Sequence, residues 1–238
     1  SSNKKDYGLS KYKTSKRAST EADFYHQYLD SAKFYKKKDI DKSLDFIEKA
    51  LKNNQSKERN AASYKTLADI YLHWKQYDLA INNYKLSNQI KETVAAKISL
   101  ANAQFLLKDF NGSKETYLDV NQQKLSNYQK IIVAEGLGDV HFALKEYSKA
   151  KNNYNAGLQI AKNNLVTPKI TDLNSKLGAV FAAEGNISLA NVQYKNSLDL
   201  ASKENTNRVL EEEEVVADFY NKSSQFDDEI KLRKESLK

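Results

Sequence analysis

Apolar and small residues recur along this chain at helical spacing, in paired segments. Within residues 64–87, Leu67 and Ala68 fall on one face of a first helix, and Ala80 and Tyr84 fall on one face of a second. Intervals of three and four residues are typical of amphipathic helices. Because the small side chains would let two backbones approach closely, this stretch predicts a helical hairpin.

The second-helix pattern of this hairpin recurs at steps of 33 to 40 residues. Its small residue returns as Ser43, Ala80, Ser113, Ala150, Ala190 and, in an imperfect last copy, Glu229. We interpret the tyrosines at repeat packing positions as core residues: Tyr64, Tyr71, Tyr84, Tyr117, Tyr154 and Tyr194. The phase held between copies predicts about six hairpins, with approximate bounds 24–57, 61–93, 94–127, 131–164, 171–204 and 210–238.

This arrangement resembles the tetratricopeptide repeat (TPR), a helical hairpin with an aromatic residue, Leu-Gly or Leu-Ala, Tyr, Ala and a second aromatic at fixed intervals. The first-helix copies are Leu67-Ala68, Leu100-Ala101, Leu137-Gly138, Leu177-Gly178 and Val216-Ala217. The resemblance covers residues 21–238 and implies an all-α, right-handed superhelical solenoid. In such a solenoid each hairpin hides its apolar face only by stacking on its neighbours.

The composition agrees with an all-α fold and excludes several classes of protein. One Pro and seven Gly among 238 residues supply too little turn chemistry for a sheet protein. The absence of Cys excludes disulfides, cysteine-ligated zinc and thiol catalysis. No apolar run reaches the ~18 residues of a membrane span. Because the chain also lacks Met, we expect it to be a processed piece of a longer protein.

Most of the net charge of +7 lies in one segment. Residues 1–20 hold six basic residues against one acidic residue and show no apolar period, so we predict a basic, flexible leader. A basic tail of this kind is typically a solvated segment, and we therefore do not expect the array to bind nucleic acid.

Sequence motifs for catalysis or metal binding are absent. His26, His73 and His141 lack the spacing of a metal site, and neither a phosphate-binding Gly-rich loop nor a nucleophile elbow occurs. The acidic run 211–214 is interpreted as the opening of a helix, where carboxylates favour the positive end of the dipole. We therefore predict no enzyme activity, no cofactor and no metal for this piece.

The TPR resemblance also implies where a partner would bind. In TPR arrays the first helices line a concave groove, and the matching positions here mix apolar residues with both signs of charge. Such a surface suits an extended peptide or a partner helix. The candidate groove residues are Tyr28, Tyr35, Lys65, Asp69, His73, Asn102, Phe105, Glu135, Asp139, Phe142 and Lys176. Only Lys65 matches the TPR subclass that clamps a C-terminal carboxylate, so chaperone-tail binding is not expected.

The basic leader and irregular repeat steps look similar to extracytoplasmic TPR sensor regions of bacterial two-component histidine kinases. The implied function is regulation of a signal-transduction kinase whose catalytic module lies outside this chain. The alternative is a structural scaffold or lipoprotein adaptor in an envelope or secretion assembly. The compartment stays open, with an extracytoplasmic, periplasmic location favoured over the cytoplasm. We expect no direct membrane insertion by this piece, and pairing with a second copy is compatible with either function.

Overall fold

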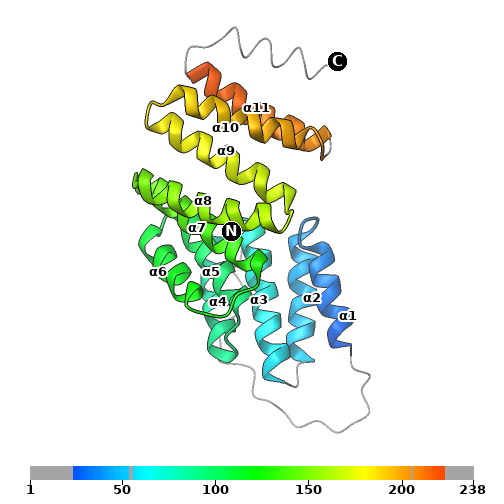
Figure 1. Ribbon diagram of the computed structural model, residues 1–238. Helices are drawn as coiled ribbons and strands as arrows, with labels where there is room; N and C mark the ends of the chain where they lie inside the picture. The colour runs from blue at the N-terminus through cyan, green and yellow to red at the C-terminus, as the bar shows by residue number, and fades with distance from the viewer. Residues whose placement is uncertain (1–23, 54–55, 205, 223–238) are drawn as a thin grey trace. The chain divides into compact units, whose positions relative to one another are not determined.

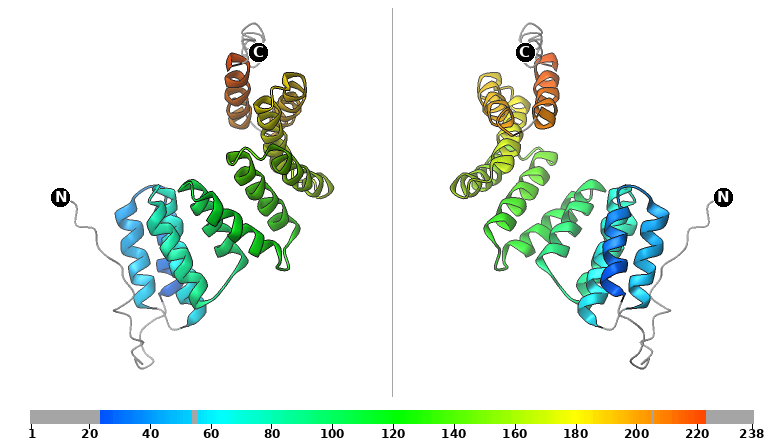
Figure 2. Two further views of the ribbon diagram at one scale, coloured as in Figure 1. Left: turned by 90° about the vertical axis from the view of Figure 1, so that its left-hand side faces the viewer. Right: turned by 90° about the vertical axis from the view of Figure 1, so that its right-hand side faces the viewer.

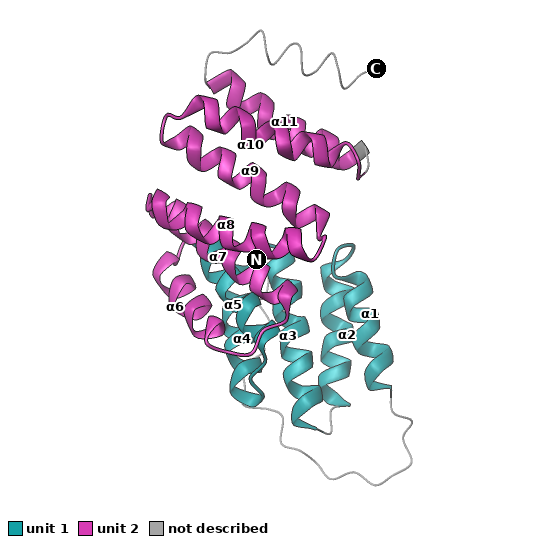
Figure 3. Cartoon of the chain, viewed as in Figure 1, with its two compact units in different colours: residues 1–107 teal, residues 108–238 magenta. Residues whose placement is uncertain are grey.

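The computed structural model describes residues 24–53, 56–204 and 206–222, and every regular element in these ranges is an α-helix (Figure 1). The described helices pack as consecutive hairpins, which confirms the prediction of an all-α hairpin array. The chain divides into two compact units, residues 1–107 and 108–238 (Figure 3). The predicted leader, the end of the sixth hairpin and Glu229 lie outside the described residues.

Unit 1 contains two complete hairpins and one further helix. Helix α1 (Tyr25–Tyr35) packs against α2 (Ile40–Lys52), and α3 (Lys57–His73) packs against α4 (Tyr77–Ile90). Helix α5 (Val94–Leu106) packs against α4. Alternate helices also touch, since α3 contacts both α1 and α5. The first helices of successive hairpins in unit 1 are therefore direct neighbours.

Unit 2 repeats this scheme with longer helices. After α6 (Phe110–Asn121), helix α7 (Asn127–Ala143) pairs with α8 (Tyr147–Asn163), and α9 (Thr167–Ala183) pairs with α10 (Ile187–Ala201). Helix α11 (Thr206–Lys222) is the last described element and contacts both α10 and α9. Helix α9 also contacts α7, so α7, α9 and α11 form a row of first helices (Figure 2).

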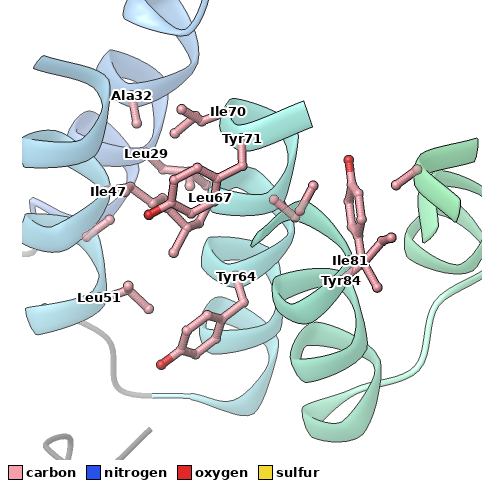
Figure 4. Close-up of a cluster of buried hydrophobic side chains, with 14 of the residues drawn as sticks. Leu29, Ala32, Ile47, Leu51, Tyr64, Leu67, Ile70, Tyr71, Ile81 and Tyr84 are labelled. Carbon is pink, nitrogen blue, oxygen red and sulfur yellow. The ribbon is translucent and has the colours of Figure 1, made fainter. Parts of the chain in front are cut away.

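The core of unit 1 lies between its helices and shows why the repeat pattern dictates this packing. Leu29 of α1, Ile47 of α2 and Leu67 of α3 meet on one side of α3, while Tyr84 of α4 lies on the other side (Figure 4). Each of these side chains is buried. Because both sides of α3 are covered, this helix depends on the hairpin before it as well as on its own partner.

The small residues at the helix crossings are buried as predicted. Ser43, Ala80, Ser113, Ala150 and Ala190 all have a relative exposure of 0 %. The hydroxyl of Ser43 donates a 2.6 Å hydrogen bond to the carbonyl of Ala32, so this position also links α2 to α1.

The six repeat tyrosines are at most 5 % exposed, which confirms their interpretation as core residues. One of them, Tyr154, lies very close to the first helix of its hairpin at Gly138. A Cβ atom there would stand 2.3 Å from Cε1 of Tyr154, whereas ordinary contacts exceed 3.4 Å. Glycine at this position therefore lets the Tyr154 ring lie directly on the backbone of α7.

The starts of two helices bear on the sequence prediction: α7 has a capping box, and α11 begins earlier than predicted. Ser126 and Gln129 form a complete capping box at the start of α7. The acidic run 211–214 does not open a helix, because α11 begins at Thr206 and has no acidic residue in its first turn. Instead, Glu212 is buried and pairs with Arg208 at 3.2 Å.

Candidate partner-binding face

Unit 2 brings two predicted acidic residues of α7 opposite the lysines of α9. Glu135 and Asp139 lie one turn apart on the same face of α7. The Nζ atom of Lys176 lies 2.6 and 2.8 Å from the two carboxylate oxygens of Asp139 and 3.5 Å from Glu135. Lys169 reaches Glu135 at 2.7 Å. Two neighbouring first helices are therefore joined by charge-assisted bonds, which are stronger than neutral hydrogen bonds.

The same chain of charges continues from α9 to α11. Lys169 lies 3.4 Å from Asp172, and Asp172 pairs with Arg208 of α11. Arg208 in turn lies 3.2 Å from Glu212. We name this set the α7–α9–α11 ion network, and its members are Glu135, Asp139, Lys169, Asp172, Lys176, Arg208 and Glu212.

Burial differs between the two ends of the ion network. The side chains of Asp139 and Lys176 keep 26 % and 31 % of their surface exposed, whereas that of Glu212 keeps 6 %. Burial raises the pKa of Glu212, although Arg208 opposes that shift. Burial alone would lower the pKa of Lys169, but its bonds to Glu135 and Asp172 outweigh burial and raise it. The more accessible charges are thus those of Asp139, Lys176 and Asp172, whose side chain is also 26 % exposed.

Asp139 is also held by the second helix of its own hairpin. The hydroxyl of Tyr154 donates to Asp139 at 2.7 Å, and the pKa of Tyr154 is raised by burial and by the Asp139 charge. Unit 1 repeats this arrangement, because Tyr84 donates to Asp69 at 2.5 Å and Lys65 lies 2.9 Å from the same carboxylate. Both pairs are separated by 15 residues.

Comparison with known proteins agrees with this architecture. Residues 135–164, which contain α8 and the end of α7, match the tetratricopeptide repeat family. No curated protein matches the chain in sequence.

Solved TPR-like structures resemble a larger part of the chain. The apo form of RapI is 18 % identical with a TM-score of 0.73, covering 89 % of this chain and 81 % of RapI. A Rap protein complexed with Competence and Sporulation Factor is 13 % identical with a TM-score of 0.66, covering 90 % and 73 %. Pseudomonas aeruginosa pilF is 16 % identical with a TM-score of 0.61, covering 86 % and 95 %. These similarities show that the fold is TPR-like.

The predicted groove residues on α3 and α5 of unit 1 differ in how they are held. Lys65 and Asp69 pair with each other on α3, and His73 is exposed at the end of the same helix. Asn102 is exposed on α5, and Phe105 is half-buried on the same helix. The structure therefore leaves polar atoms of α3 and α5 accessible within unit 1.

Three predicted aromatic residues have clear packing partners within their own hairpins. Tyr35 stacks on Phe46 of α2 with a centroid distance of 5.7 Å, and Tyr28 lies 6.5 Å from the same ring. Phe142 packs against Tyr147 of α8 at 5.8 Å. These rings are half-buried, so each contributes to hairpin packing as well as to the surface.

Sequence reasoning missed four members of the ion network: Lys169, Asp172, Arg208 and Glu212. A signal for them exists, because the partners recur about one TPR step apart. Lys169 follows Glu135 by 34 residues, and Arg208 follows Asp172 by 36. Oppositely charged residues separated by one repeat on first helices would have pointed to the network.

Two further observations bear on other kinds of site. Among the described residues, no cluster of His, Cys, Asp and Glu side chains could hold a metal ion. None of the described helices combines the length and apolar character that a bilayer crossing requires.

His141 is interpreted from sequence as a packing residue. Its Nδ1 atom lies 2.5 Å from a carboxylate oxygen of Glu146, and the hydrogen bond from His141 lowers the pKa of that carboxyl.

Proposed function

We propose that this chain is a binding module that holds a protein or peptide partner on its first-helix faces. The observation that carries the proposal is the Asp139–Lys176 pair on the row of α7, α9 and α11. Both side chains are held in place by neighbouring helices and still keep about a quarter or more of their surface exposed. Preorganised charges of both signs favour an extended segment that offers carboxylates and N–H donors.

The TPR-like fold supports the same function class. The Rap protein of similar fold is complexed with Competence and Sporulation Factor. A protein with this kind of fold therefore holds a bound partner. In our chain the partner would lie along α7, α9 and α11 of unit 2, and an equivalent face is offered by α3 and α5 of unit 1. No covalent chemistry is needed for such a function.

Within this class, the proposed biological role is the sensory or regulatory region of a bacterial signal-transduction histidine kinase. This finer assignment rests on the sequence resemblance alone. The coding sequence that follows Lys238 tests it directly. An apolar stretch of about 20 residues followed by a helix carrying a phosphorylatable His supports the kinase. Further hairpins in that position favour the scaffold or adaptor instead.

Selection from a displayed random peptide library tests the binding proposal, because it does not require the natural partner. The immobilised chain should enrich peptides whose binding weakens at least ten-fold in Lys176→Ala. Lys195→Ala is the matched control, because Lys195 is an exposed lysine on α10, a second helix. Lys176→Met, which keeps the aliphatic stem, separates loss of charge from loss of packing. Peptides that bind Lys176→Ala and Lys176→Met as tightly as the unmodified chain would contradict the proposed face.

A further inference from the structure

Two helix–helix turns of unit 1 lie side by side at one end of the first two hairpins. The first turn, residues 36–39, joins α1 to α2, and the second, residues 74–76, joins α3 to α4. The indole N–H of Trp74 donates a 2.8 Å hydrogen bond to the backbone carbonyl of Lys36, which ties the turns together. We name the surface they form the turn surface, and its members are Phe34, Lys36, Lys37, Lys38, Trp74 and Lys75.

The turn surface exposes two large aromatic side chains. Phe34 is 59 % exposed and Trp74 is 40 % exposed, although aromatic rings are normally the side chains that a small domain buries most. The only polar atom of the Trp74 ring is already bonded within the protein. What Trp74 and Phe34 present to the surroundings is therefore apolar surface.

Four lysines lie in the same two turns. Within the described part of the chain, Lys36, Lys37, Lys38 and Lys75 have no carboxylate partner, in contrast to Lys42, which pairs with Asp39 at 3.6 Å. The turn surface thus combines exposed aromatic rings with cations that no carboxylate of the described residues neutralises.

Lys75 occupies a turn position that favours glycine. Its φ of 58° is left-handed, and the corresponding turn between α9 and α10 does use Gly185 at φ 78°. A lysine at this position destabilises the turn relative to glycine. Lys145 has the same conformation at φ 60° in the turn between α7 and α8, where no tryptophan is present. The two lysines are therefore matched in backbone and differ in their aromatic neighbour.

We propose that the turn surface docks the protein on an anionic lipid bilayer. Trp74 and Phe34 would enter the headgroup layer, where amphipathic and aromatic side chains are favoured. The four lysines would face the lipid phosphates, since basic residues near an anionic leaflet strengthen binding additively. This is adsorption of a surface and requires no membrane-spanning helix.

A single-stranded nucleic acid fits the turn surface less well. Binding of that kind depends on bases stacking on open aromatic faces. The Nζ atom of Lys38 lies 3.5 Å from the centroid of the Phe34 ring and occupies one of its faces. His73 also meets the Trp74 ring edge to face at 5.8 Å. Rings crowded in this way can still enter a lipid interface edge first.

Trp74 is the only tryptophan of the chain, so its fluorescence reports on the turn surface alone. Vesicles of equal parts phosphatidylglycerol and phosphatidylcholine should shift its emission to the blue and expose it to quenching by bromine-labelled lipid. Vesicles of pure phosphatidylcholine should cause neither effect, and added salt should reverse the shift. Binding to anionic vesicles without a change in Trp74 emission would overturn the proposal, because another segment would then carry the contact.

Two glycine substitutions provide matched variants. Lys75→Gly removes a turn-surface charge and relieves backbone strain, so it should not unfold the protein. Lys145→Gly makes the same change at φ 60° in the turn between α7 and α8. Lys75→Gly should weaken binding to the anionic vesicles about five-fold, and Lys145→Gly should leave it within two-fold. Equal losses in both variants would overturn the proposal.

Phe34→Ser tests the aromatic contribution at a largely exposed position. We expect weaker vesicle binding and a smaller fluorescence shift, with the helical circular dichroism unchanged. An oligonucleotide and polyglutamate serve as competing anions. The proposal is wrong if Lys75→Gly weakens binding of the oligonucleotide or of polyglutamate but leaves vesicle binding unchanged. The partner would then not be a bilayer.

Discussion

The hydroxyl of Tyr154 donates a 2.7 Å hydrogen bond to Asp139, across the two helices of one hairpin. The bond joins a core side chain of α8 to a partly exposed carboxylate of α7 that also holds Lys176. Tyr84 and Asp69 repeat the relationship in unit 1 at the same sequence separation. In these two hairpins a buried tyrosine therefore fixes the position of a charge on the candidate binding face.

We expect Tyr154→Phe to destabilise the protein by about 1.5–3 kcal/mol, because the lost bond is made to a charged acceptor. Urea denaturation followed by circular dichroism measures the change. Tyr128→Phe is the matched control, since Tyr128 is 55 % exposed and its hydroxyl loss should change stability by less than about 0.5 kcal/mol. Equal effects of the two substitutions would show that the Tyr154–Asp139 bond contributes nothing.

Stability should fall steeply above pH 10. Burial raises the pKa of Tyr84, Tyr117 and Tyr154, and it raises the pKa of Tyr194 to about 12. Above pH 10 these tyrosines lose their protons in the unfolded chain but keep them in the folded one. The folded state then binds more protons, so the free energy of unfolding decreases as pH rises.

Ultraviolet absorbance of tyrosinate, recorded together with circular dichroism, checks this pH dependence. Tyr84, Tyr117, Tyr154 and Tyr194 should ionise only as the helices melt. Tyr154→Phe should make the loss of stability with pH less steep. Ionisation of every tyrosine near pH 10 with the helical signal intact would contradict the burial of these hydroxyls.

Gly138→Ala should cost about 1–3 kcal/mol through overpacking, because the new Cβ atom would stand 2.3 Å from the Tyr154 ring. Gly157→Ala is the control on α8, where the nearest contact would be 3.3 Å from Cβ of Ala134. In thermal denaturation, Gly138→Ala should therefore have a lower Tm than Gly157→Ala. The reverse order would mean that the ring moves aside without penalty.

Arg208→Met should destabilise the protein by about 3 kcal/mol at pH 7, because Glu212 would be left buried without its cation. Burial already raises the pKa of Glu212, and loss of Arg208 should raise it further. The folded state then binds a proton more readily than the unfolded chain, so stability relative to the unmodified protein should partly recover as pH falls from 7 towards 5.

Urea titrations at the two pH values measure this recovery, with Lys195→Met as the control for loss of an exposed cation. A deficit in Arg208→Met that stays constant between pH 7 and pH 5 would mean that Glu212 is not the group left unpaired.

The sequence predicts the hairpins well because their packing repeats. Ala80 and Tyr84 follow helical spacing and recur in phase, and both are fully buried. The charge contacts between hairpins are harder to predict, because a long side chain such as that of Arg208 can reach several carboxylates once the first helices are side by side.

The prediction that the acidic run 211–214 opens a helix is wrong. The helix starts at Thr206, and Glu212 is held by its ion pair with Arg208 and not by the helix dipole.

Mapping a bound peptide by backbone amide chemical shifts tests the central claim most directly, with a library-selected peptide and the isotope-labelled chain. Our account predicts shifts concentrated on α7, α9 and α11 around Asp139 and Lys176, and their loss in Lys176→Ala. Shifts concentrated on the exposed sides of α8 and α10, unchanged by Lys176→Ala, would contradict it.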